Sequence, residues 1–191
     1  MTQKEKQALN LTSTLLVATP QMRDPRFRQA VIVVCGHDSN GAMGLVVNKL
    51  VDTLTFKALL RQLKIPISQS MPDVDIHYGG PIEIGRGFVL HTTDYQSSST
   101  IPINETLALT ATAEILEIIA AGAGPNRYLL ALGYAGWSPG QLESEVESNS
   151  WLIVPYEEDL IFGADMGLRW KKAMDVLGVH PEMLVESAGH A

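Results

Sequence analysis

The sequence lacks several features that would point to a function at once. It has one cysteine in 191 residues, so no disulfide can form within the chain, and a lone thiol fits a reducing compartment. No apolar run approaches the roughly 18 residues that a membrane helix needs, and no apolar signal core follows the polar N-terminus. We therefore expect a cytoplasmic protein that does not insert into a membrane.

Positive charge is also scarce. The chain carries 14 Lys and Arg against 21 Asp and Glu, and its net charge of −7 falls wholly after residue 137. Nucleic acids are bound through clustered Lys and Arg that neutralise phosphates. The one basic cluster, Arg23, Arg26 and Arg28, is interrupted by Asp24. Direct binding of nucleic acid is therefore disfavoured.

Motifs for common enzyme chemistry are missing. The sequence contains neither a Gly-x-Ser-x-Gly nucleophile elbow nor a phosphate-binding Walker loop, and Gly85-Arg86-Gly87 lacks the spacing of a dinucleotide-binding fingerprint. Glu143, Glu145 and Glu147 are two residues apart, and such positions do not share a helical face. The sequence therefore predicts no cofactor, and it favours a protein that is not an enzyme.

The composition that remains is typical of one packed domain. Hydrophobic residues make up 46% of the chain and charged residues 18%. We expect residues 1–10 to form a disordered polar tail and residues 11–191 a single domain. Short apolar runs predict strands at 15–18, 31–35, 42–48, 74–78, 87–91, 101–103, 128–134 and 151–155. With a hairpin at Asn40-Gly41, the interleaved strands and helices indicate an α+β fold around a mixed sheet of six to eight strands.

Helical periodicity occurs in three further places. The apolar residues at 56, 59, 60 and 63 line one face of a helix that Thr53 or Thr55 can cap. Asn104 can cap a longer helix that runs to Ala120, before the glycines at 122 and 124. A third helix is predicted from Asp165 to Leu177, with Pro181 opening a short last turn.

The stretch from Tyr134 to Glu143 joins a strand to a helix. Gly136 permits a sharp turn, Ser138 is suited to be the helix N-cap, and Pro139 fits the first helical position. Gln141 completes a Ser-x-x-Gln capping box. The junction can hold a ligand at free backbone N–H groups, or it can be a structural corner.

Cys35 and His37 are the candidates for catalysis. Residues two apart on a strand share a face, so the pair could activate a thiolate or supply two metal ligands. No dense second pair of ligands accompanies them, and no metal site is predicted. A lone cysteine that ends an apolar strand can equally be a small core residue.

A second group of residues could bind a ligand. Arg86 lies between two glycines, where it could hold an anion bidentately or simply pair with Glu83. Strand ends carry loops that are held by a rigid scaffold yet remain exposed. We therefore expect the loops at Asn48, at 79–86 and at 136–141 to meet at one end of the sheet. The ligand-binding candidates are Asn48, Gly79, Gly80, Arg86, His91, Trp137, Gln141 and Glu143.

Three blocks of the chain together resemble a known family. They are Thr19-Pro20-x-Met22-x-Asp24-Pro25-x-Phe27 with Cys35-x-His37 and Gly41–Asn48, then Gly79-Gly80-Pro81 with Arg86–His91, and then Gly133–Trp137 with Gly140-Gln141-Leu142-Glu143-x-Glu145 and Trp151. This order, over residues 14–155, is similar to the YqgE/AlgH family. Gly36 departs from the acidic residue that is common there, and Lys49-Leu50 from the more usual Arg-Pro.

The resemblance implies a compact bacterial α+β fold, in which a mixed sheet curls toward a small barrel with helices around it. It implies no established activity, and the family's association with regulation of alginate synthesis defines no biochemical mechanism. We expect a non-enzymatic binding or regulatory protein with a polar pocket built from loops. Its partner would be a small anionic ligand or a protein, and the chain would be a monomer or a weak homo-oligomer. The alternative is a redox sensor or a hydrolytic enzyme that uses Cys35 and His37.

Overall fold

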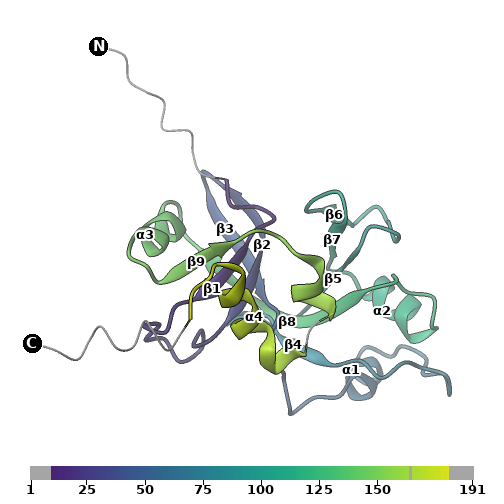
Figure 1. Cartoon of the computed structure of the whole chain (residues 1–191). Coiled ribbons are helices and arrows are strands. Elements are labelled where there is room, and N and C mark those ends of the chain that lie inside the picture. The colour runs from purple at the N-terminus through teal and green to yellow at the C-terminus, as the bar shows by residue number, and fades with distance from the viewer. Residues whose placement is uncertain (1–9, 164, 181–191) are drawn as a thin grey trace, which may run out of the picture.

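The computed structural model describes residues 10–163 and 165–180, and in them nine strands form one sheet (Figure 1). Eight strands follow the order β6-β7-β5-β8-β3-β2-β1-β9, and β4 pairs with β8 beside this path. All neighbours are antiparallel except β4 and β8, which are parallel. The strands are β1 Leu15–Ala18, β2 Val31–Asp38, β3 Gly41–Val46, β4 Ile76–Tyr78, β5 Ile82–Thr92, β6 Ile101–Pro102, β7 Leu107–Thr110, β8 Tyr128–Trp137 and β9 Trp151–Val154.

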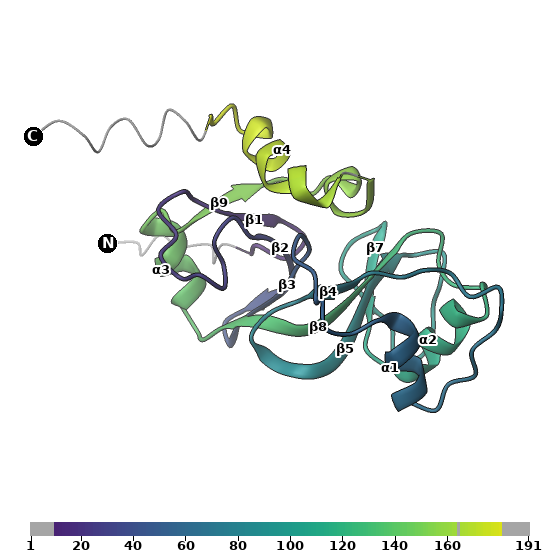
Figure 2. The same cartoon turned by 90° about the horizontal axis from the view of Figure 1, so that it is seen from below.

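The long strand β8 joins the two halves of the sheet. Its first part pairs with β4 and β5, and its last part, from Ala135 to Trp137, pairs with β3. Figure 2 shows β8 passing from the half that holds β5 and β7 to the half that holds β1, β2 and β3. Between these parts Gly133 has a φ of 71°, a conformation that favours glycine. The opposite strand β5 shifts register between Ile82 and Gly87, and the sheet curls there.

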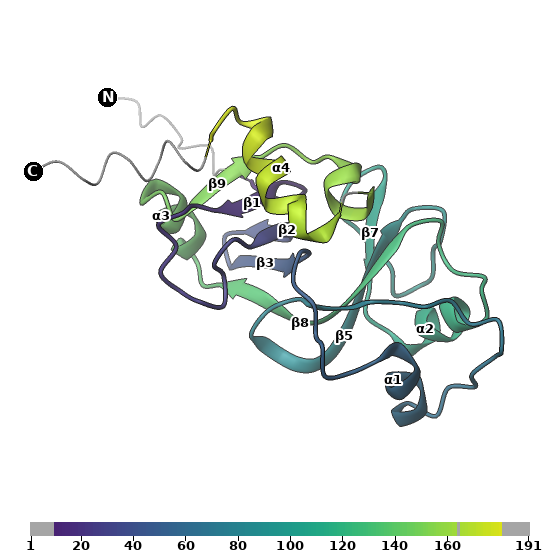
Figure 3. The same cartoon turned by 60° about the horizontal axis from the view of Figure 1, so that its bottom comes forward.

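Helices cover both sides of the curled sheet. They are α1 Phe56–Gln62, α2 Ala113–Ala120, α3 Gln141–Glu147 and α4 Arg169–Val176, with a π-helical turn η1 at Asp159–Gly163 and a 3₁₀ turn η2 at Met166–Leu168. The inner face of the sheet packs against η1 and α4, which lies over β1 and β2 in Figure 3. On the outer face, α1 and α2 cover the β4–β5–β8 region, and α3 covers the β1–β3 region.

The predicted α+β fold with a curling mixed sheet is confirmed, and most strand positions are as expected. The Asn40-Gly41 turn joins β2 to β3, and Thr55 caps α1 by accepting a hydrogen bond from the N–H of Ala58 at 3.2 Å. The nine observed strands exceed the upper end of the predicted range of six to eight by one. Residues 1–9 and the turn expected at Pro181 lie outside the described residues.

The long helix predicted from Asn104 was wrong. Residues 107–110 form strand β7 instead, and the helix α2 begins only at Ala113. The Asn104 Oδ1 accepts hydrogen bonds from the N–H groups of Thr106 and Leu107, so this residue closes a turn that leads into a strand. All four residues of β7 are buried, with β5 and β6 as neighbours, and this two-sided burial outweighs helix propensity.

The junction after β8 also differs from the prediction. Gly136 does not turn the chain, because β8 continues to Trp137, and α3 starts at Gln141 after Gly140 at a φ of 75°. Half of the capping box is present, since the Gln141 Oε1 accepts a hydrogen bond from the Ser138 N–H at 3.0 Å. The Ser138 side chain has no capping bond to α3 in the described structure.

We predict that Gly80→Ala destabilises the fold severely. A Cβ at Gly80, whose φ is 155°, would lie 2.0 Å from the carbonyl carbon of Tyr134 in β8, and backbone cannot yield as a flexible side chain can. The free energy of unfolding in urea should fall by about 3 kcal/mol or more.

Gly85→Ala is the matched control, because a Cβ there meets no atom within 4 Å. It should change the free energy of unfolding by less than about 1 kcal/mol. Equal stability of the two variants would show that the contact between residue 80 and β8 is not tight.

Candidate functional site

Two clefts flank the end of β8, and Ile82, Gly136 and Trp137 line both. The first, which we call the Arg86 cleft, has a volume of about 920 Å³. Its walls come from the β2–β3 hairpin, the bulged start of β5, the β6–β7 region and the residues after β8. The polar and aromatic side chains that line it include His37, Asp38, Glu83, Arg86, Tyr134, Trp137 and Ser138.

Arg86 supplies the positive charge of the Arg86 cleft. Its Nη1 lies 3.2 Å from Glu83 Oε2, and its guanidinium lies 5.1 Å from the centre of the Phe88 ring. The two charged side chains are 55% and 50% exposed, and exposed ion pairs contribute only about 0–1 kcal/mol. Both uses foreseen for Arg86 are therefore compatible, because a ligand can replace Glu83 at little cost.

His37 lines the same cleft, but both of its ring nitrogens are occupied. The Nδ1 accepts a hydrogen bond from the Leu11 N–H at 3.0 Å, so the Nε2 carries the proton of the neutral ring. That Nε2–H donates to Glu143 Oε1 at 3.1 Å and ties β2 to α3. His37 is buried, and in this arrangement it offers no free nitrogen for general base catalysis.

The expectation that Cys35 and His37 share a face was wrong. The register of β2 against β3 shifts between Val34 and Gly36, and such a bulge turns the following side chains to the other face. Cys35 lies in the inner core, where burial raises the pKa of its thiol to about 12. A thiol with this pKa stays protonated at neutral pH, which disfavours it as a nucleophile.

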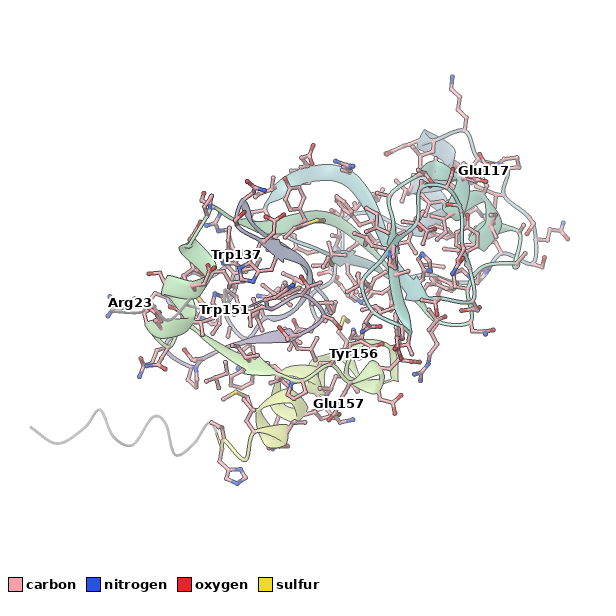
Figure 4. All side chains as sticks on the ribbon, turned by 90° about the horizontal axis from the view of Figure 1, so that it is seen from above. Arg23, Glu117, Trp137, Trp151, Tyr156 and Glu157 are labelled. Atoms are coloured by element: carbon pink, nitrogen blue, oxygen red, sulfur yellow. The ribbon has the colours of Figure 1, made fainter. Side chains whose placement is uncertain are left out.

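The second cleft, which we call the Trp151 cleft, has a volume of about 840 Å³ and lies on the other side of β8. The Glu145 Oε2 accepts hydrogen bonds from the indole N–H groups of Trp137 at 2.9 Å and Trp151 at 2.8 Å. Its Oε1 accepts one from the Gln141 side chain at 2.8 Å. In Figure 4, Trp137 and Trp151 lie next to each other, with Arg23 on the same side of the molecule.

The remaining candidates hold the structure together and do not line the Arg86 cleft. The Asn48 side chain bonds the backbone of Gln29 and Val31, and Gly79 and Gly80 pack closely against β8. The His91 Nδ1–H donates to the carbonyl of Thr92, and its Nε2 accepts from the Thr110 hydroxyl at 2.8 Å. Burial lowers the pKa of His91. Gln141 lines the Trp151 cleft, and the Glu143 carboxylate accepts the hydrogen bond from His37.

The predicted meeting of loops is therefore partial, since Arg86 and the segment 136–139 share a cleft while Asn48 lies apart from it. Sequence reasoning missed the role of Glu145 as an acceptor for two indoles. Its spacing of i, i+4 from Gln141 gave a signal, but the contact with Trp151 depends on tertiary structure. It also missed Arg169, whose burial no local pattern indicates.

Two general features of the described residues bear on function. No helix within 10–163 or 165–180 is long and apolar enough to cross a membrane. Over the same residues, no group of three or more His, Cys, Asp or Glu side chains is placed to hold a metal ion.

Taken together, the fold and the clefts define a single-domain α+β protein in which a curled half-barrel sheet carries open polar clefts beside its central strand. The AlgH-like family, DUF179, matches residues 15–182, and the chain belongs to this family. The resemblance found over residues 14–155 is thus confirmed, and the match extends beyond the point at which the motifs fade.

Bacterial relatives and solved structures agree with this assignment. A UPF0301 protein of Rhodospirillum rubrum is 46% identical over 181 residues, covering 95% of this chain and 94% of that protein. One of Cereibacter sphaeroides is 46% identical over 184 residues, covering 96% and 100%. The solution structure of AlgH from Pseudomonas aeruginosa has a TM-score of 0.78 at 39% identity, with full coverage of both chains. The crystal structure of a Corynebacterium diphtheriae protein shares the fold, with a TM-score of 0.67 at 20% identity over 86% and 85% of the chains.

We predict that Glu145→Ala destabilises the protein by about 2 kcal/mol or more, because two indole N–H groups lose their acceptor. Glu147→Ala in the same helix is the matched control, since Glu147 is exposed and has no side-chain hydrogen bond in the described structure. Urea unfolding followed by circular dichroism measures both. Equal losses in the two variants would show that the Glu145 bonds contribute little.

We also predict that native Cys35 resists alkylation by iodoacetamide between pH 7 and 9. The pKa of the Cys35 thiol, about 12, lies well above the ordinary cysteine value of about 8.5. The thiolate population of the native protein is therefore roughly 1,000-fold smaller than that of the unfolded chain. Mass spectrometry of the modified protein follows the reaction, with urea-unfolded protein as the control. Comparable rates in the native and unfolded chains would contradict the burial of this thiol.

Proposed function

We propose that the protein is a non-enzymatic binding protein that holds a small anionic ligand in the Arg86 cleft. The observation that carries this proposal is the position of Arg86, an exposed cation whose one ion pair is weak, in a cleft of about 920 Å³. Hydroxyl and aromatic groups of Ser138 and Tyr134 line the same cleft. Such a mixture of apolar walls and a few polar groups is typical of small-molecule sites.

The arrangement of nearby reactive groups favours binding over catalysis. His37 has both nitrogens engaged, and the Cys35 thiol lies on the other face of β2 with a raised pKa. A Cys35–His37 redox sensor or hydrolase would need these groups side by side with a free thiolate. These observations weigh against that alternative and support a role in recognition.

A protein partner is the second candidate. The observation that favours it is a set of exposed apolar side chains at the rim of the Arg86 cleft. Ile82 and Ile101, which line the cleft, are 37% and 59% exposed, and Ile84, two residues before Arg86, is 67% exposed. Exposed apolar side chains around a polar centre are a feature of protein–protein contact sites. A regulatory partner that covers this rim would present an acidic group to Arg86. We retain the proposals of a cytoplasmic location and of a monomer or weak homo-oligomer.

We predict that Arg86→Ala abolishes anion binding without unfolding the protein. Phosphate, sulfate and citrate are titrated into the ¹⁵N-labelled protein, and the amide shifts of residues around 82–88 and 136–139 are followed. The variant should lose these shift changes, while its free energy of unfolding changes by less than about 1 kcal/mol, because the pair with Glu83 is exposed.

Arg61→Ala is the matched control for the loss of one surface cation, since Arg61 is exposed in the last turn of α1 and lines neither cleft. It should bind anions as the unaltered protein does. Shift changes that persist in Arg86→Ala, or that vanish equally in both variants, would exclude Arg86 as the anion-binding group.

A further inference from the structure

A third cavity, which we call the Arg169 pocket, lies away from both clefts and shares no lining residue with them. Its volume is about 350 Å³, close to the lower end of the range for small-molecule sites. The walls come from the segment that leads into β4, the start of β8, η1 and the start of α4. The lining side chains used below are Asp73, Asp75, His77, Tyr128, Phe162 and Arg169.

Arg169 is a buried cation that forms no ion pair among the described residues, and burial lowers its pKa although the charge of Asp165 opposes that shift. Only 7% of the residue is exposed, and no Asp or Glu oxygen in the described structure lies within 4 Å of its guanidinium. Its Nη1 donates to the carbonyl of Val47, whereas its Nε is buried and has no hydrogen-bond partner there. Buried charges in proteins are normally paired, so this guanidinium is suited to an anion from outside the chain.

The part of the guanidinium that is left over matches a carboxylate. Because Nη1 is used by Val47, the edge formed by Nε and Nη2 has no partner among the described residues, and two parallel N–H groups on such an edge bind a carboxylate bidentately. The Nε is closed to solvent in this structure, so the ligand carboxylate would displace the side chains that cover it. Arg169 is the first residue of α4, which has eight residues, so the positive end of that helix adds to the attraction for an anion.

Three other polar side chains of the pocket offer acceptors, which favour a cation. Asp73 and Asp75 are exposed side chains that line it. The His77 Nδ1–H donates to the carbonyl of Leu130 at 3.2 Å, which leaves the lone pair on Nε2. Burial, with the charge of Arg169, lowers the pKa of His77 to about 4, so the ring is neutral at pH 7. A simple anion would be attracted by Arg169 but repelled by the two carboxylates.

We propose that the Arg169 pocket binds a free α-amino acid. The ligand carboxylate pairs with the Nε–Nη2 edge of Arg169, and its ammonium group faces Asp73, Asp75 and the His77 Nε2. The side chain of the ligand lies against Tyr128 and Phe162. A zwitterion of this kind satisfies the buried cation and the acceptors together, which neither a plain anion nor a plain cation does.

The test uses the full-length protein, isothermal titration calorimetry and the twenty amino acids as probes. We expect at least one apolar amino acid, with L-leucine as the reference probe, to bind with a Kd below about 1 mM, which is a modest affinity for a small ligand. For leucine, 4-methylpentanoate lacks the ammonium group and 3-methylbutylamine lacks the carboxylate. Each analogue should bind at least about tenfold more weakly, because each loses one charged contact.

Variants assign the contacts. Arg169→Lys keeps the charge but loses the bidentate edge, and it should weaken binding about tenfold or more. Since a change at a buried site can disturb folding, the double variant Asp73→Asn with Asp75→Asn provides a second route through exposed residues. It should weaken leucine binding but leave 4-methylpentanoate binding equal or tighter. Asp175→Asn, an exposed residue of α4 that does not line the pocket, should change neither.

Several outcomes would overturn the proposal. They are an absence of binding by all twenty amino acids, binding of 4-methylpentanoate or inorganic phosphate as tightly as leucine, or a double variant that binds leucine unchanged. The result is separable from the function proposed for the Arg86 cleft, because Arg86→Ala should leave amino acid binding at Arg169 intact.

Discussion

The structure depends on the close backbone contact between β8 and the segment that precedes β5. Gly79 donates to the carbonyl of Leu132, and a Cβ on Gly80 would lie 2.0 Å from the backbone of Tyr134. On the facing side, a Cβ on Gly133 would lie 2.4 Å from the carbonyl oxygen of Gly80. Three glycines thus let the two backbone segments meet without side chains between them. This contact positions β8 as the strand shared by both halves of the sheet.

The placement of β8 determines where the polar sites lie. Its end separates the Arg86 cleft from the Trp151 cleft, and its start forms one wall of the Arg169 pocket. Polar side chains near this strand fall into two kinds. Glu145, His37 and His91 are engaged in hydrogen bonds that stabilise the fold. Arg86 and Arg169 have cationic groups that the described structure satisfies only in part, and both proposals of function rest on that difference.

Membership of the AlgH-like family fixes the fold but assigns no chemistry to these cations. The Cys-x-His pattern does not form a reactive pair here, because burial raises the pKa of the Cys35 thiol and a bulge in β2 separates the two side chains. What remains is a scaffold whose open surfaces suit recognition, with an exposed arginine in a large cleft and a buried arginine in a small one.

The sequence by itself determined most of the strands, the β2–β3 hairpin, the α+β class and the family, because apolar runs, turn residues and ordered motifs are local signals. It did not determine the secondary structure of residues 107–110, since their burial between β5 and β6 arises only when distant strands pair. The bulge at Val34–Gly36 was equally hidden, as one extra residue reverses the face of His37 without changing the apolar pattern. Arg86 was found in advance because glycines flank it. Tertiary structure alone decided the burial of Arg169 and the hydrogen bonds from two indole N–H groups to Glu145. Both depend on contacts between separate elements of the fold.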